Sequence, residues 1–200
     1  MFWETHANVF PVATLVNTFF EARVENLFAL AGLIEDAFSS AGLDYRVIGG
    51  LATYLYVEER DPDAGRLTRD IDIVVRREDL DAIARAVRPF GLEYRHVAGM
   101  DMLLQAGQPS GRRAVHMVFS GEKVLETYSE AVPTFGGVKV LQGIRLVPVA
   151  DLVRMKLTSF RLKDQVHLKD LDEAGVISDA VIASLPADLR GRLQEVRAAR

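Results

Sequence analysis

The chain has 200 residues, of which 49% are hydrophobic and 26% charged, so it is long and apolar enough for one globular domain with a sizeable core. It has no cysteine, which excludes a disulfide framework, cysteine-ligated zinc and thiol catalysis and fits a reducing cytoplasm. The formal net charge of −4 argues against electrostatic coating of nucleic acid, but not against a local basic patch. No apolar run has membrane-spanning length and no signal-peptide pattern opens the chain, so we expect a cytoplasmic protein without a membrane partner.

The N-terminal region combines aromatic residues with a helical pattern. Phe2, Trp3 and Phe10 precede a proline, and they predict an arm that packs either on the body of the protein or on a second subunit, which would make a homodimer. Over residues 16–40 the apolar side chains recur at helical spacing, and Gly42 ends the predicted helix.

The most informative stretch is 45–76, where an apolar run ends in Gly49 and Gly50. A helical pattern follows over 51–57, and then a polar loop over 58–67. A glycine pair lets a backbone approach a phosphate closely, and the N–H groups at the start of a helix favour anions. This part of the stretch therefore predicts a phosphate-binding turn.

Asp70 and Asp72 close the same stretch, where they alternate with two isoleucines. In a strand the side-chain period is two, so both carboxylates would leave one face, where they repel each other and resist desolvation. A divalent cation removes that penalty, and Mg²⁺ prefers a few carboxylates plus phosphate oxygens. The alternative is an edge strand with a solvated face, but the glycine pair upstream favours a metal clamp for nucleotide chemistry.

The rest of the chain predicts further strands and then helices. An amphipathic helix is expected over 78–90, short strands over 92–97, 102–105 and 113–119, a hairpin over 138–146, and helices over 150–162, 166–174, 178–184 and 187–200. Strands in the middle with helices before and after them predict an α+β domain with a helical C-terminal extension.

These motifs resemble the nucleotidyltransferase fold of the DNA polymerase beta superfamily, and more closely the bacterial nucleotidyltransferases of abortive-infection and toxin–antitoxin systems. The glycine pair, the helix and the Arg-x-Thr-x-Asp-Ile-Asp pattern at 66–72 carry the resemblance, and 152–171 is similar to the helices that follow the core in that family. The resemblance implies a short mixed sheet flanked by helices. It places a core with its N-terminal arm and helix at 1–147, and a helical part that closes the cleft at 148–200.

The same resemblance implies an enzyme that needs Mg²⁺ or Mn²⁺ and moves a nucleoside monophosphate from an NTP, such as ATP, to a hydroxyl. Asp70 and Asp72 would hold the metal, and Gly49 and Gly50 would hold the phosphates. The acceptor would be the end of a tRNA, a protein side chain or a small alcohol. A toxin role would add a cognate antitoxin as partner.

Further nucleotide contacts are expected on both sides of the carboxylates. Thr68 belongs to the motif, and Arg66 would either reach the phosphates or belong to a plain connecting loop. Lys156 would neutralise the triphosphate, with help from Lys163 and Asp164; on one continuous helix the two lysines would share a face. A solvated helix face with charge pairs is the alternative for this cluster.

The sequence departs from the family pattern at the third carboxylate, where His116 stands. A neutral imidazole can ligate a metal or act as a general base near pH 7, and a histidine that is only hydrogen-bonded within the sheet is the alternative. Asp101 is a spare carboxylate on a nearby segment.

Two other functions are alternatives to nucleotidyl transfer to RNA, protein or a small alcohol. A degenerate member would bind nucleotide or a partner protein as a regulatory module without turnover, and the missing carboxylate supports it. A small-molecule nucleotidyltransferase of the antibiotic-modifying kind should have an acidic acceptor pocket, whereas Lys156, Arg161 and Lys163 suit an anionic acceptor such as RNA.

Overall fold

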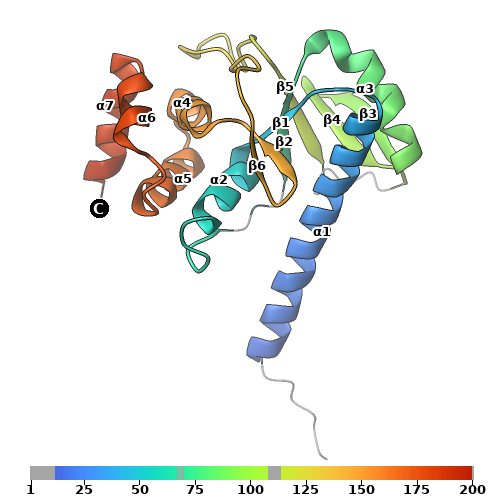
Figure 1. Cartoon of the computed structure of the whole chain (residues 1–200), viewed down its shortest axis with the longest axis horizontal. Helices are drawn as coiled ribbons and strands as arrows, with labels where there is room; N and C mark the ends of the chain where they lie inside the picture. The colour runs from blue at the N-terminus through green and yellow to red at the C-terminus, as the bar shows by residue number, and fades with distance from the viewer. Residues whose placement is uncertain (1–11, 67, 69, 108–113, 200) are drawn as a thin grey trace, which may run out of the picture.

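The computed structural model describes residues 12–66, 68, 70–107 and 114–199, with side chains from residue 24 onward (Figure 1). The α-helices are α1 Val12–Ser40, α2 Gly49–Glu58, α3 Leu80–Ala86, α4 Val149–Ser159, α5 Leu162–Glu173, α6 Asp179–Ser184 and α7 Ala187–Ala198. The strands are β1 Arg46–Ile48, β2 Ile71–Val75, β3 Leu92–Val97, β4 Met100–Gln105, β5 Val115–Phe119, β6 Lys139–Leu141 and β7 Ile144–Leu146, and 3₁₀ turns cover Arg77–Asp79 and Arg88–Phe90. The α+β class is confirmed.

The strands form one mixed sheet in the order β3-β4-β5-β2-β1-β7-β6. β2 runs parallel to β5, and β1 runs parallel to β7, while the other neighbours are antiparallel. The central pair β2–β5 sets Asp72 opposite His116. The predicted short mixed sheet flanked by helices is therefore correct.

Helix α1 differs between its two halves. In the second half Leu27, Leu30, Ile34 and Phe38 are buried, which is the helical spacing that the sequence predicts. The first half extends away from the body of the molecule (Figure 1). The aromatic arm ahead of it, and with it the predicted contact to a second subunit, lies outside the described residues.

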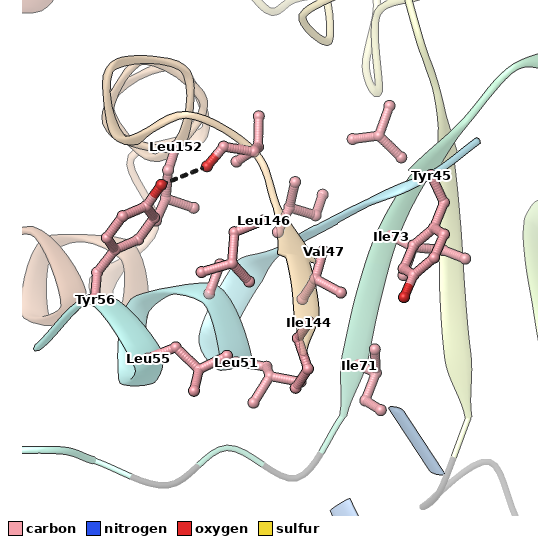
Figure 2. Packing of buried hydrophobic residues seen from close by; sticks show 14 of the residues in the cluster. Tyr45, Val47, Leu51, Leu55, Tyr56, Ile71, Ile73, Ile144, Leu146 and Leu152 are labelled. Atoms are coloured by element: carbon pink, nitrogen blue, oxygen red, sulfur yellow. Dashed lines mark hydrogen bonds between the residues drawn. The ribbon is translucent and has the colours of Figure 1, made fainter. Parts of the chain in front are cut away.

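The core lies between the sheet and the helices on its faces. Leu51 and Leu55 of α2 are buried beside Ile144 and Leu146 of β7 (Figure 2). The hydroxyl of Tyr56 donates a hydrogen bond of 2.8 Å to the carbonyl of Val147, which ties the end of α2 to the strand beside it. This packing fixes α2, and so the glycine pair at its start.

Helices α4 to α7 gather on the side of the sheet away from α3 (Figure 1), and both α4 and α5 contact α2. α4 ends at Phe160, which adopts a left-handed conformation with a φ of 48°. The chain therefore turns between Lys156 on α4 and Lys163 on α5, so the two lysines lie on separate helices and the condition of one continuous helix is not met. In the described part of the chain, no helix is both long and apolar enough to cross a membrane.

Candidate active site

The turn from β1 into α2 can be built only with glycine at position 49. Gly49 has a φ of +67°, and a Cβ added there would lie 2.0 Å from Oδ2 of Asp72. The hydroxyl of Thr53 donates to the carbonyl of Gly49 at 2.9 Å and holds the turn from the helix side. The Asp72 carboxylate therefore lies directly against the backbone that begins α2.

Gly50 performs a similar task for the segment that leads into β2. A Cβ at Gly50 would lie 2.5 Å from Oγ1 of Thr68. The Thr68 hydroxyl in turn donates to the carbonyl of Asp70 at 3.4 Å. Thr68 is thus packed on the first turn of α2, and it connects that turn to the first carboxylate of the motif.

Asp70 and Asp72 lie next to each other, but only Asp72 belongs to the strand. β2 begins at Ile71, and Asp70 lies in a bend just before it, so the expectation of two strand carboxylates is wrong for Asp70. Nδ1 of His116 lies 3.4 Å from Oδ1 of Asp72, and the two side chains are 30% and 32% exposed. The hydrogen bond to Asp72 raises the pKa of His116, and the nearby charge of Asp70 adds to that effect.

Asp101 does not share this site. It pairs with Met117 across the β4–β5 ladder, while Met102 pairs with His116, so Asp101 faces the other side of the sheet. Its carboxylate accepts hydrogen bonds from Tyr94 at 2.6 Å and from His96 at 2.9 Å. The spare carboxylate therefore cannot replace the missing one.

Lys156 of α4 lies near enough to Asp72 for the charge of that carboxylate to affect its pKa. Its side chain is only 4% exposed, and Nζ lies 2.9 Å from Nδ1 of His167 and 3.9 Å from Oδ1 of Asp164. Burial lowers the pKa of Lys156 to about 8, although the negative charges of Asp164 and Asp72 oppose that shift. Burial together with the charge of Lys156 lowers the pKa of His167 to about 4, so this imidazole is neutral and accepts from the ammonium.

Asp164 organises the corner between α4 and α5. One of its oxygens, Oδ2, accepts from the Ser159 hydroxyl at 2.7 Å, from Nε of Arg161 at 2.8 Å and from the Arg161 backbone N–H at 3.3 Å. Burial raises the pKa of Asp164, but the hydrogen bonds from Arg161 and Ser159 outweigh it, and the pKa is lowered overall. Asp164 therefore remains charged beside Lys156.

The remaining predicted residues lie at the edge of this arrangement. Lys163 is exposed at the start of α5, and its charge contributes to the lowered pKa of Lys156. Arg66 is 69% exposed, and its Nε lies 3.1 Å from Oδ1 of Asp170 on α5. Sequence reasoning missed Asp170; the signal was the spacing of Asp164, His167 and Asp170, which places three polar side chains on one face of α5.

The residues present suit a magnesium site of one particular kind. Among the described residues, no group of three or more His, Asp or Glu side chains could by itself hold a metal ion. Mg²⁺, however, is commonly held by one or two carboxylates that share it with substrate phosphates and water. Asp70 and Asp72, two residues apart in the chain and both partly exposed, with Asp72 beside the glycine turn, fit that mode.

A surface pocket of about 310 Å³ lies elsewhere, at the far end of α2. Its lining is Tyr56, Glu59, Arg60, Val138, Lys139, Pro148, Val149 and Val176. It includes none of the predicted site residues, and Lys139 and Glu59 close part of its rim as an ion pair of 2.7 Å.

No protein-family model and no curated protein matches the chain. Solved structures do. A nucleotidyltransferase-like protein from Paracoccidioides brasiliensis is 17% identical with a TM-score of 0.56, over 88% of this chain and 89% of that one. The Megavirus polyadenylate synthase is 12% identical with a TM-score of 0.51, over 89% of this chain but only 39% of its own length. ANT(2")-Ia in complex with adenylyl-2"-tobramycin is 12% identical with a TM-score of 0.50, over 85% of this chain and 96% of that one. The chain has the nucleotidyltransferase fold.

Proposed function

We propose that the protein is a metal-dependent nucleotidyltransferase that moves a nucleoside monophosphate from an NTP to a hydroxyl group. One observation supports this most: Asp72, the second carboxylate of the motif, lies against the glycine turn of α2, and its charge acts on the buried ammonium of Lys156. Carboxylates for a divalent cation, backbone N–H groups for phosphate and one cation for the triphosphate are the parts that nucleotidyl transfer needs.

In this proposal each residue has a defined task. The N–H groups at the start of α2, beyond Gly49, bind triphosphate oxygens, and Lys156 neutralises part of their charge. Mg²⁺ held by Asp70 and Asp72 would supply further charge neutralisation at the phosphates.

The acceptor oxygen attacks the α-phosphorus, the bond from that phosphorus to the bridging oxygen of the β-phosphate breaks, and pyrophosphate leaves with its electron pair. The acceptor proton passes to His116, the imidazole beside Asp72.

The acceptor class is part of the proposal. A small-molecule hydroxyl is supported by the likeness to ANT(2")-Ia, whose structure contains adenylylated tobramycin. An RNA end is favoured by the cations Lys156, Arg161 and Lys163 on the helical side of the site. The transfer experiment below therefore supplies the protein with both an RNA acceptor and a small-molecule acceptor.

A nucleotide-binding module without turnover is the second candidate. His116 occupies the place of a third carboxylate, and Asp101, the nearby alternative, faces the other side of the sheet. A protein with two carboxylates would still hold Mg²⁺ and nucleotide at the same turn, but it would bind a second metal ion poorly.

The test is incubation with each α-labelled NTP, Mg²⁺ or Mn²⁺, and either total tRNA or tobramycin, with the label followed into RNA, antibiotic and protein. Label transfer that is lost in Asp72→Asn and kept in Asp101→Asn would support the enzyme and identify the acceptor. Nucleotide binding in calorimetry without transfer to any acceptor would favour the binding module. Absence of both would overturn the proposal.

A further inference from the structure

Three contacts fix the segment that leads into the carboxylate motif. Two of them join the loop after α2 back to α2 itself, Gly65 to the ring of Tyr54 and Thr68 to Gly50, and the third joins it to α5, Arg66 to Asp170. A Cβ at Gly65 would lie 2.8 Å from Cε2 of Tyr54, so the backbone runs directly over that ring. Asp70 lies between these contacts and Ile71, the first residue of β2.

The two side chains of the Arg66–Asp170 contact differ strongly in their exposure to solvent. The Arg66 side chain is 69% exposed, whereas that of Asp170 is 9% exposed. Oδ2 of Asp170 is buried and has no hydrogen-bond partner in the described part of the structure. Burial raises the pKa of Asp170, and the charge of Arg66 only partly opposes it.

An aspartate in this place does little for stability. A buried carboxylate with one unpaired oxygen is costly, and an ion pair with an exposed arginine contributes little. An apolar residue of similar size would often stabilise such a position. What Asp170 does contribute is a fixed point on α5 for the loop that carries the motif.

The helix that provides this fixed point also carries the helical side of the site. Asp164 and His167 lie six and three residues before Asp170 on the same face of α5, and both contact Lys156. The Arg66–Asp170 contact therefore joins the segment before Asp70 to the helix that positions Lys156.

We propose that Arg66 and Asp170 form a clasp that sets the distance between the carboxylate pair and Lys156, and so the affinity of the site for its metal ion. Both act as positioning residues: neither touches substrate, and their effect passes through Asp70 and Asp72. The catalytic consequence rests on the proposed function, whereas the effect on the loop does not.

The first test needs no activity. Amide hydrogen exchange is measured by mass spectrometry in the peptide over 60–70 for wild type, Arg66→Gln and Asp170→Asn. We expect exchange to be about threefold to tenfold faster in both variants, with the global unfolding midpoint almost unchanged. Asp172→Asn is the matched control, because it breaks an Arg–Asp pair of 2.6 Å on the same helix that faces α7 instead.

The second test separates the clasp from a direct phosphate contact. With a clasp, Arg66→Gln and Asp170→Asn raise the Mg²⁺ concentration needed for half-maximal transfer by a similar factor, and the KM for NTP changes little. Arg66→Lys restores part of the loss. If Arg66 binds phosphate instead, only its own variants change, and they raise the KM for NTP.

Two outcomes overturn the proposal: wild-type exchange rates in the 60–70 peptide of both variants, or a change confined to Arg66. If the wild type transfers no nucleotide at all, the proposed function fails, while the exchange experiment still decides whether the clasp exists.

Discussion

The two sides of the site are built in opposite ways. On the sheet side, Asp72 and His116 are about one-third exposed and form one loose contact of 3.4 Å. On the helical side, Lys156 and Asp164 are each about 4% exposed and take part in a set of short hydrogen bonds. The polar groups on the sheet side are thus accessible to a ligand, whereas those on the helical side already have hydrogen-bond partners within the protein.

This difference predicts which substitutions should affect ligand binding and which should affect the stability of the fold. Neutralising a partly exposed carboxylate changes the free energy of unfolding little, so such a substitution should affect ligand binding and catalysis. Buried, paired groups are expensive to disturb, so their removal should affect folding as well. The predictions below test that division, from the largest expected effect to the smallest.

Neutralising the sheet side should remove activity and leave the fold intact. In Asp72→Asn we expect transfer to fall by on the order of 10³-fold, because a metal ligand and the partner of His116 are lost together. The free energy of unfolding should change by less than about 0.5 kcal/mol, since the side chain is partly exposed. Transfer kinetics and urea unfolding measure both, and an unfolded variant would show that the carboxylate is structural.

Neutralising a residue on the helical side should lower both the free energy of unfolding and the affinity for NTP. In Asp164→Asn, one buried oxygen that accepts from Ser159 and Arg161 becomes an imperfect acceptor, and the charge beside Lys156 is lost. We expect a loss of about 3 kcal/mol in the free energy of unfolding, together with weaker NTP binding. Arg161→Gln removes only the exposed partner and should cost about 0.5–1 kcal/mol. Equal losses in the two variants would contradict the comparison.

The glycine turn lies between the two sides and can be tested with a matched pair. In Gly49→Ala, the φ of +67° and the Asp72 oxygen at 2.0 Å both oppose a methyl group, so we expect a loss of about 2–3 kcal/mol and of metal binding. Gly42 has a φ of +65° with nothing within 4 Å, so Gly42→Ala should cost only about 1 kcal/mol and leave transfer unchanged. Calorimetry with Mg²⁺ and thermal unfolding would distinguish them.

The smallest effect concerns pH. Burial lowers the pKa of Lys156 to about 8 in the folded chain, below the ordinary lysine value of 10.5. Between these two pH values the unfolded chain binds more protons, so stability rises with pH. From pH 7.5 to 9 the wild type should gain about 1 kcal/mol relative to Lys156→Met, while its NTP affinity falls as the ammonium is lost. Lys163→Met, at an exposed position, is the control. A wild-type curve parallel to that of Lys156→Met would refute the lowered pKa.

The sequence predicts those features that depend on local patterns. Helical spacing predicts the buried face of the second half of α1, and the mixed sheet with its flanking helices is what the family resemblance implies. The structure places the backbone at Gly49 against the Asp72 carboxylate, while phosphate binding at this turn stays a prediction. The β2–β5 ladder sets Asp72 opposite His116. Their catalytic roles remain predictions.

Other features depend on contacts distant in sequence and could not be predicted. The turn at Phe160 interrupts an apolar pattern that continues through it, because Phe160 adopts its left-handed conformation in a corner that Asp164 organises. Asp170 resembled an ordinary solvated helix residue until the fold placed Arg66 beside it. β2 begins at Ile71, one residue after Asp70, although the alternation of the two aspartates with isoleucines includes both.

The end of the chain also takes part in the helical side. Arg192 of α7 donates to the carbonyls of Leu157 at 2.7 Å and Thr158 at 3.0 Å, and its guanidinium lies 5.2 Å from the centre of the Phe160 ring. It thereby satisfies carbonyls that the end of α4 leaves without helical partners. During synthesis the glycine turn and the carboxylates emerge long before this arginine does. A growing chain should therefore fold its sheet early and complete its site only after α7 has emerged.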